Sequence, residues 1–64
     1  MSQFGQTLRR LRVERKLTQH QLAVAAGCVG QQISNYETGR VIPELQTLIK
    51  LADALQVRLD TFRS

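Results

Sequence analysis

The sequence is poor in the residues that build catalytic, metal and disulfide sites. Its 64 residues include one cysteine, Cys28, and one histidine, His20. A single cysteine cannot close an intramolecular disulfide, and one cysteine with one histidine is too few ligands for a structural zinc ion. The same shortage leaves no credible nucleophile–base pair. We therefore predict that the chain is not an enzyme and binds no metal or cofactor.

Other absences limit the folds and the cellular compartments that fit this sequence. Proline occurs once, at Pro43, and no apolar run approaches the roughly 20 residues that a membrane-spanning helix needs. β-Branched residues do not alternate with polar ones as they do in strands, and there is no repeat or internal linker. We predict one all-α domain over residues 1–64. A lone thiol and the lack of a signal-like start favour a cytoplasmic protein.

Positive charge is concentrated in the first part of the chain. The net charge is +4, and residues 1–40 hold six lysines and arginines against two glutamates, whereas residues 41–64 hold three residues of each sign. This asymmetry is typical of a surface that approaches phosphates. A solvated, arginine-rich helix face gives the same composition, so charge alone does not decide between the two.

Two helices are expected in the first half of the chain. Over about residues 4–16, apolar side chains recur at the spacing of one helical stripe. Thr18 followed by Gln21 is a capping box, in which the hydroxyl accepts from a backbone N–H and the glutamine reaches back. Gly27 ends this second helix because glycine adopts the left-handed conformation at little cost.

Three further helical segments are expected after Gly27. Residues 30–37 form a polar helix with only two apolar anchors, Ile33 and Tyr36. Residues 44–55 carry a wide apolar stripe, formed by Leu45, Leu48, Ile49, Ala52 and Leu55. A last short helix is expected to close the core or meet a partner, through Val57, Leu59 and Phe62.

The second and third predicted helices have the spacing of a helix-turn-helix, because three residues join them. Ala23 is small where the helices cross, and Gly27 supplies the turn. The inward-facing positions are occupied by Leu22, Ala26, Cys28, Ile33 and Tyr36. This spacing alone is moderately specific, since chance matches occur in other helical proteins.

Three segments carry a more specific pattern: LTQHQLA, ISNYETG and IPELQTLIKLADAL. On these segments the sequence resembles the Cro/cI-like (XRE-type) helix-turn-helix family, which includes the lambda-like phage repressors. The likeness extends over nearly the whole chain. It implies a compact five-helix, lambda-repressor-like domain, usually a dimer on a two-fold-related operator, whose third helix reads the major groove of double-stranded DNA.

The resemblance also assigns roles in DNA binding. Gln31 and Asn35 fall at base-reading positions, and Gln32 beside them is expected to touch a base or a phosphate. Carboxamides suit this task because they donate and accept hydrogen bonds at once. Gln19 and Arg40 correspond to phosphate-contacting positions, and a helix N-terminus such as that at Gln19 favours anions.

Other positions of the family pattern are structural or altered. Arg12 and Glu37 correspond to an ion pair that joins the first helix to the end of the third. Arg9 is the arginine of the first helix that we expect to contact phosphate. Val29 stands where serine or threonine usually caps the third helix, and Gly30 replaces a base-reading side chain. We therefore expect a missing cap, and a first base contact that is either absent or made by the backbone.

The sequence thus predicts a sequence-specific transcriptional regulator, a repressor, that binds a palindromic operator as a homodimer in the nucleoid. A dimer would place its reading helices about 34 Å apart, and the apolar C-terminal segment is the expected contact between copies. Two alternatives stay open. Such domains also serve as protein-interaction modules, for example antitoxins that bind a toxin, and the chain could be the DNA-binding fragment of a longer regulator.

Overall fold

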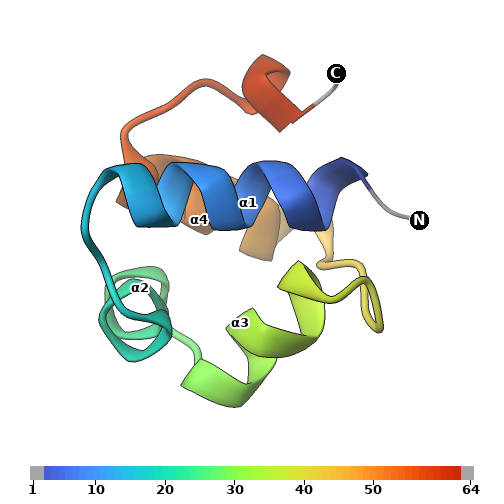
Figure 1. Ribbon diagram of the computed structural model, residues 1–64. Helices are drawn as coiled ribbons and strands as arrows, with labels where there is room; N and C mark the ends of the chain where they lie inside the picture. The colour runs from blue at the N-terminus through green and yellow to red at the C-terminus, as the bar shows by residue number, and fades with distance from the viewer. Residues whose placement is uncertain (1–2, 63–64) are drawn as a thin grey trace.

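Helical periodicity without strand signals gives an all-helical chain. The computed structural model describes residues 3–62, which contain four α-helices, one 3-10 helix and no strand. In chain order these are α1 (Gln3–Glu14), α2 (Gln19–Ala26), α3 (Gly30–Glu37), α4 (Leu45–Leu55) and η1 (Leu59–Phe62) (Figure 1). The all-α prediction is confirmed.

The prediction of five helices is wrong in its last element. Residues 59–62 form a single 3-10 turn, in which the Thr61 N–H donates to the carbonyl oxygen of Arg58, three residues earlier, at 3.0 Å. Four residues are too few to propagate α-helical hydrogen bonds, so this segment forms the tighter 3-10 turn.

The start of α2 is fixed by its capping box. Thr18 Oγ1 accepts from the Gln21 N–H at 3.0 Å, and Gln21 Oε1 accepts from the Thr18 N–H at 2.9 Å. At the other end, Gly27 takes φ = 74° and its N–H donates to the last carbonyls of the helix. Both ends of α2 therefore follow from local chemistry, as the sequence predicts.

We expect Thr18→Ala to lower the free energy of unfolding by about 1 kcal/mol, because two N–H groups lose their capping geometry. Urea denaturation followed by circular dichroism measures the change. Thr18→Ser is the matched control, since it keeps the hydroxyl and should retain most of the stability. An equal loss in both variants would show that the methyl group, and not the cap, is what matters.

α3 begins without a side-chain cap from its N-cap residue. Val29 has no acceptor to offer, as expected, but the Val29 N–H donates to Gln32 Oε1 at 3.1 Å. The glutamine thus supplies one half of a capping box from inside the helix. The missing cap at this end of α3 is therefore partly replaced. Gln32, although exposed, makes a structural hydrogen bond.

The core lies where the helices cross. α2 packs against α3 and α4, and α1 packs against α3. The largest fully buried side chains are Leu8, Leu22, Ile33, Leu51 and Leu55, each contributing about 1.5–3 kcal/mol by leaving water. Ile33 and Tyr36, the two predicted anchors of α3, are both buried, so an otherwise polar helix is held by its inner face.

Of two predictions about apolar segments, closure of the core by the C-terminal segment is confirmed and the wide stripe on α4 needs correction. Val57 and Phe62 pack against the domain's own core, and the Phe62 ring lies 5.1 Å from that of Phe4. The C-terminal segment therefore packs against α1 beside Phe4. Among the described residues of this segment, Leu59 is the one large apolar side chain that stays exposed. In α4, Leu45 and Ile49 are 66% and 40% exposed, because the predicted stripe is wider than the groove that α4 fills.

Candidate nucleic-acid interface

The outer face of α3 presents three carboxamide side chains. Gln31 and Gln32 are exposed and Asn35 is half-buried. Gln31 Nε2 donates to Asn35 Oδ1 at 3.2 Å, one helical turn away. The contact leaves Gln31 with its oxygen and a second N–H, which is the donor–acceptor pair that matches adenine N6 and N7. All three predicted base-reading residues thus lie on one helix, away from its buried anchors.

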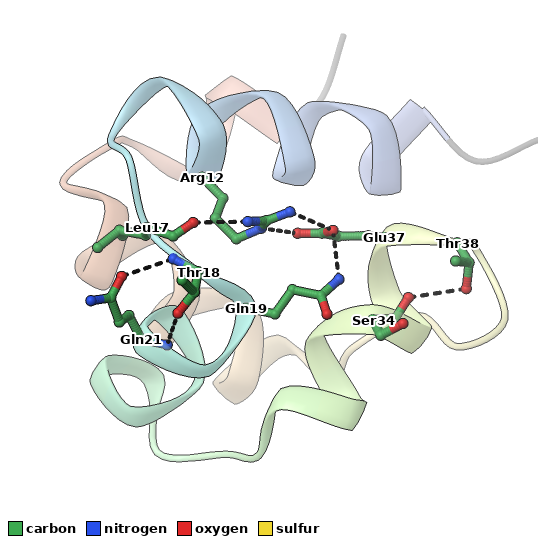
Figure 2. A network of polar contacts seen from close by, with 8 residues as sticks. All are labelled: Arg12, Leu17, Thr18, Gln19, Gln21, Ser34, Glu37 and Thr38. Carbon is green, nitrogen blue, oxygen red and sulfur yellow. Dashed lines mark hydrogen bonds and ion pairs between the residues drawn. The ribbon is translucent and has the colours of Figure 1, made fainter.

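A buried carboxylate holds the C-terminal end of α3 in place (Figure 2). Glu37 Oε2 accepts from Arg12 Nε at 2.6 Å, and Glu37 Oε1 accepts from Arg12 Nη2 at 3.2 Å. The Glu37 side chain is 4% exposed and the Arg12 side chain 12%. Arg12 Nη1 also donates to the carbonyl oxygen of Leu17 at 2.8 Å. The expected ion pair is present, and it is bidentate.

The same carboxylate also reaches the first residue of α2. Gln19 Nε2 donates to Glu37 Oε1 at 3.1 Å (Figure 2). One side chain therefore ties together α1, α2 and α3, so the predicted phosphate anchor and the end of the predicted reading helix share a hydrogen-bond acceptor. The family pattern identifies the ion pair, but the contact from Gln19 has no separate signal in the sequence.

α1 and α3 approach so closely that a side chain does not fit between them. An ideal Cβ on Gly5 would lie 2.5 Å from the Glu37 carbonyl oxygen and 2.7 Å from that of Tyr36. Gly5 is buried and is needed for this contact. Sequence reasoning missed it, although an isolated glycine inside an apolar helical pattern is itself a signal of close packing.

The arginines divide into exposed charges and structural donors. Arg9 on α1 and Arg40 just after α3 are exposed, as phosphate contacts require, and the Arg40 N–H donates to the Asn35 carbonyl oxygen at 3.0 Å. Arg10 lies 3.5 Å from Glu14 on the same face. Arg15 Nε donates to the Leu55 carbonyl oxygen at 2.6 Å, so it caps the end of α4, a role that sequence reasoning missed.

Cys28 is a packing residue of the turn between α2 and α3. It is half-buried against the core, and this burial raises the pKa of its thiol, with a smaller opposing effect from Lys50. A raised pKa keeps the thiol protonated at neutral pH, and the thiolate is the reactive form. Burial likewise raises the pKa of Tyr36.

The described residues contain no other candidate site. Residues 3–62 include no group of three or more histidine, cysteine, aspartate or glutamate side chains placed to hold a metal ion. No pocket opens in this part of the chain, and none of its helices is long and apolar enough to cross a membrane. The exposed face of α3 and the residues around it are therefore the site that the geometry offers.

Comparison with known proteins agrees with this geometry. The family described as "Helix-turn-helix domain" matches residues 3–63, nearly the entire chain. The chain belongs to this helix-turn-helix family. The HTH-type transcriptional repressor RghR of Bacillus subtilis is 48% identical over 58 residues. Multiprotein-bridging factor 1 of Candida albicans is 44% identical over 55 residues. These stretches are 89% and 86% of this helix-turn-helix chain.

Solved structures of helix-turn-helix proteins share the fold. The restriction-modification controller protein C.AhdI from Aeromonas hydrophila superposes with a TM-score of 0.91 at 33% identity, covering 94% of this chain and 91% of that one. The P22 c2 repressor, in complex with the synthetic operator 9T, gives a TM-score of 0.89 at 29% identity, over 92% and 89% of the two chains. The resemblance to the Cro/cI-type branch of the family is thereby confirmed.

The curated relatives are longer than this chain. The matched stretch is 43% of RghR and 36% of the Candida albicans bridging factor. The likeness to them therefore concerns the helix-turn-helix domain and not the remainder of those proteins.

Proposed function

We propose that this helix-turn-helix domain binds double-stranded DNA sequence-specifically and acts as a transcriptional regulator, specifically as a repressor. The observation that carries the proposal is the outer face of α3, where Gln31, Gln32 and Asn35 are presented together and away from the core. Relatives named as a transcriptional repressor and a repressor in complex with operator support it. We expect the protein to be found on DNA in the nucleoid.

The proposed mechanism separates positioning from reading. Exposed basic side chains, Arg9 and Arg40, supply salt-dependent attraction to phosphates. Gln19, at the start of α2, uses one N–H on Glu37 and has a second N–H to donate to a phosphate beside the helix N-terminus. Gln31 and Asn35 then discriminate base edges in the major groove. Two copies on a palindromic operator would present two such faces.

The test is selection of bound duplexes from a random pool, followed by affinity measurements on the Gln31→Ala/Asn35→Ala double variant. We expect its affinity for the selected site to fall about thirtyfold or more, because two base contacts are lost and each is worth about 1–3 kcal/mol. Non-specific binding and its salt dependence should stay unchanged, since phosphate contacts are intact.

Gln46→Ala is the matched control, because Gln46 is an exposed glutamine on α4. It should bind the selected site as the wild type does. If the double variant also keeps wild-type affinity, or if selection enriches no sequence and binding disappears as salt rises, the base-reading proposal is wrong.

A second candidate is a protein-interaction module, which the likeness to multiprotein-bridging factor 1 favours. An antitoxin that holds a toxin is one form of such a module. The same double variant separates the two functions, since a domain that binds a protein partner through this face of α3 would lose that partner when Gln31 and Asn35 are truncated. Loss of a protein partner with unchanged DNA binding would favour this second candidate.

A further inference from the structure

Two of the proposed base-reading side chains contact each other in the domain without DNA. Gln31 Nε2 donates to Asn35 Oδ1 at 3.2 Å, and the two residues lie four positions apart on α3, a spacing at which side chains of a helix meet. Gln31 is exposed, whereas Asn35 is half-buried. The contact therefore joins a side chain that projects into solvent to one that lies closer to the body of the domain.

Asn35 belongs to the C-terminal end of α3, which is held firmly. Gly39 takes φ = 81°, and the chain turns back after the helix (Figure 1). The Gly39 N–H donates to the Tyr36 carbonyl oxygen at 3.3 Å and the Arg40 N–H to that of Asn35 at 3.0 Å, which are the two bonds of a Schellman motif. The Thr38 hydroxyl also donates to the Asn35 carbonyl oxygen, at 3.3 Å. The backbone that carries the Asn35 side chain is therefore fixed from several sides.

Gln31 belongs to the less restrained end of the same helix. α3 has no side-chain cap from Val29, and Gly30, which precedes Gln31, has no side chain to pack against it. Gln32 Oε1 already accepts from the Val29 N–H. Within the part of the chain that the structure describes, Asn35 is the one hydrogen-bond partner of the Gln31 side chain. Without that bond, the side-chain torsions of the glutamine would move among their staggered positions.

We propose that Asn35 is a positioning residue for Gln31, and that the two side chains read DNA as a coupled pair. The inference rests on the proposed function and gives Asn35 a second role, in which it acts through Gln31 as well as on a base of its own. With one N–H on Asn35 Oδ1, Gln31 keeps Oε1 and its second N–H for adenine N6 and N7. The Nδ2 hydrogens of Asn35 remain as donors to a base acceptor, such as thymine O4 or guanine O6.

The size of the effect follows from how often the Gln31 side chain has the conformation that binds. A site that is competent for only a fraction of the time has its apparent affinity reduced by that fraction. Releasing one torsion with three staggered positions lowers the fraction about threefold, and releasing two lowers it about ninefold. A duplex with another base at this position gains nothing from Gln31 in either case. Removing the bond to Asn35 should therefore lower discrimination at the base pair that Gln31 reads.

The test measures discrimination at that base pair. Selection of bound duplexes gives the site, and Gln31→Ala identifies the base pair whose identity then no longer matters. For each variant, discrimination is the ratio of the dissociation constants for two duplexes that differ at this base pair alone. We expect Asn35→Leu, which keeps the approximate size of the side chain and removes the acceptor, to lower this ratio about threefold to ninefold.

Asn35→Asp is the conservative variant that should restore discrimination. Its carboxylate still accepts from Gln31 Nε2, so the ratio should stay at the wild-type value. Its affinity for every duplex should fall, because the carboxylate repels the phosphates and has no N–H to donate. Ser34→Ala is the matched control, since it truncates the half-buried residue beside Asn35 and leaves both members of the pair in place. It should match the wild type in ratio and in affinity.

A measurement on the free protein tests the orienting contact without DNA. NMR relaxation of the Gln31 side-chain amide reports its motion on the picosecond-to-nanosecond timescale. We expect this amide to be ordered in the wild type and in Asn35→Asp, and mobile in Asn35→Leu. Circular dichroism verifies that each variant is folded.

Failure of this inference and failure of the proposed function give different results. A wild-type ratio in Asn35→Leu, or equal mobility of the Gln31 amide in Asn35→Leu and the wild type, overturns the inference while the selected site upholds the proposed function. An equal fall of the ratio in Asn35→Leu and Asn35→Asp also overturns it, because the acceptor is then not what matters. If selection enriches no sequence, the proposed function fails and the inference fails with it.

Discussion

Replacing Glu37 with alanine is expected to lower the free energy of unfolding by about 3–5 kcal/mol, because it strands the buried Arg12 guanidinium without its counter-charge. The Arg12 side chain is only 12% exposed, so water cannot replace the lost partner. Gln19 loses its acceptor in the same step. A domain of this length has roughly 3–10 kcal/mol of stability in total, so Glu37→Ala should remove a large part of it. Urea denaturation followed by circular dichroism measures this.

Two controls isolate the effect of burial. Glu14 also pairs with an arginine, Arg10, but these side chains are 54% and 57% exposed. Glu14→Ala should therefore cost at most about 0.5 kcal/mol. The double variant Arg12→Leu/Glu37→Leu should be more stable than Glu37→Ala, because neither charge remains to be desolvated. Similar losses for Glu14→Ala and Glu37→Ala would show that the buried pair has no special role.

Gly5→Ala is expected to destabilise the domain by about 2–3 kcal/mol, even though alanine favours helices more than glycine does. The new Cβ would lie under 3 Å from carbonyl oxygens of α3, and a backbone atom cannot rotate away as a side chain can. α1 and α3 must then separate. The measurement is thermal unfolding together with NMR chemical shifts of α3, and we expect both stability and the position of α3 to change.

Gly30→Ala is the matched control for this substitution. A Cβ there would be 3.7 Å from the nearest atom, the His20 Cα, which is an ordinary van der Waals contact. We expect Gly30→Ala to leave stability unchanged or raise it by up to about 1 kcal/mol, through lower conformational entropy of the unfolded chain. If both glycine variants gained stability, the close approach of α1 and α3 would be refuted.

The helices and the turn could be predicted from the sequence because their signals are local. The cap between Thr18 and Gln21 spans three residues, and Gly27 marks its own left-handed conformation. The anchors Ile33 and Tyr36 follow from helical spacing, so the buried and exposed faces of α3 could also be assigned. The exposed face, which carries Gln31 and Asn35, is the part of α3 that the two anchors do not occupy.

Contacts between residues that are far apart in the sequence could not be predicted from such local signals. Arg15 bonds a carbonyl group 40 residues along the chain, and nothing in the local pattern of α1 distinguishes it from a solvated arginine. The exposure of Leu45 and Ile49 depends on how wide a groove the other helices leave, which periodicity does not measure. The half-cap that Gln32 gives Val29 was within reach, since a glutamine three residues after an N-cap is a known signal.

The way α3 is attached has a consequence for how this domain can change its specificity. Its hold on the scaffold comes from Ile33, Tyr36 and Glu37, all on the inner side or at the C-terminal end. The Gln31 side chain is exposed and contributes little packing, so under the proposed function a substitution there would alter base recognition without disturbing the fold. A Cβ on Gly30 would lie at an ordinary van der Waals distance from His20, so a side chain can be added at the N-terminal end of α3. Under the proposed function, recognition could therefore evolve, or be redesigned, one side chain at a time on an unchanged fold.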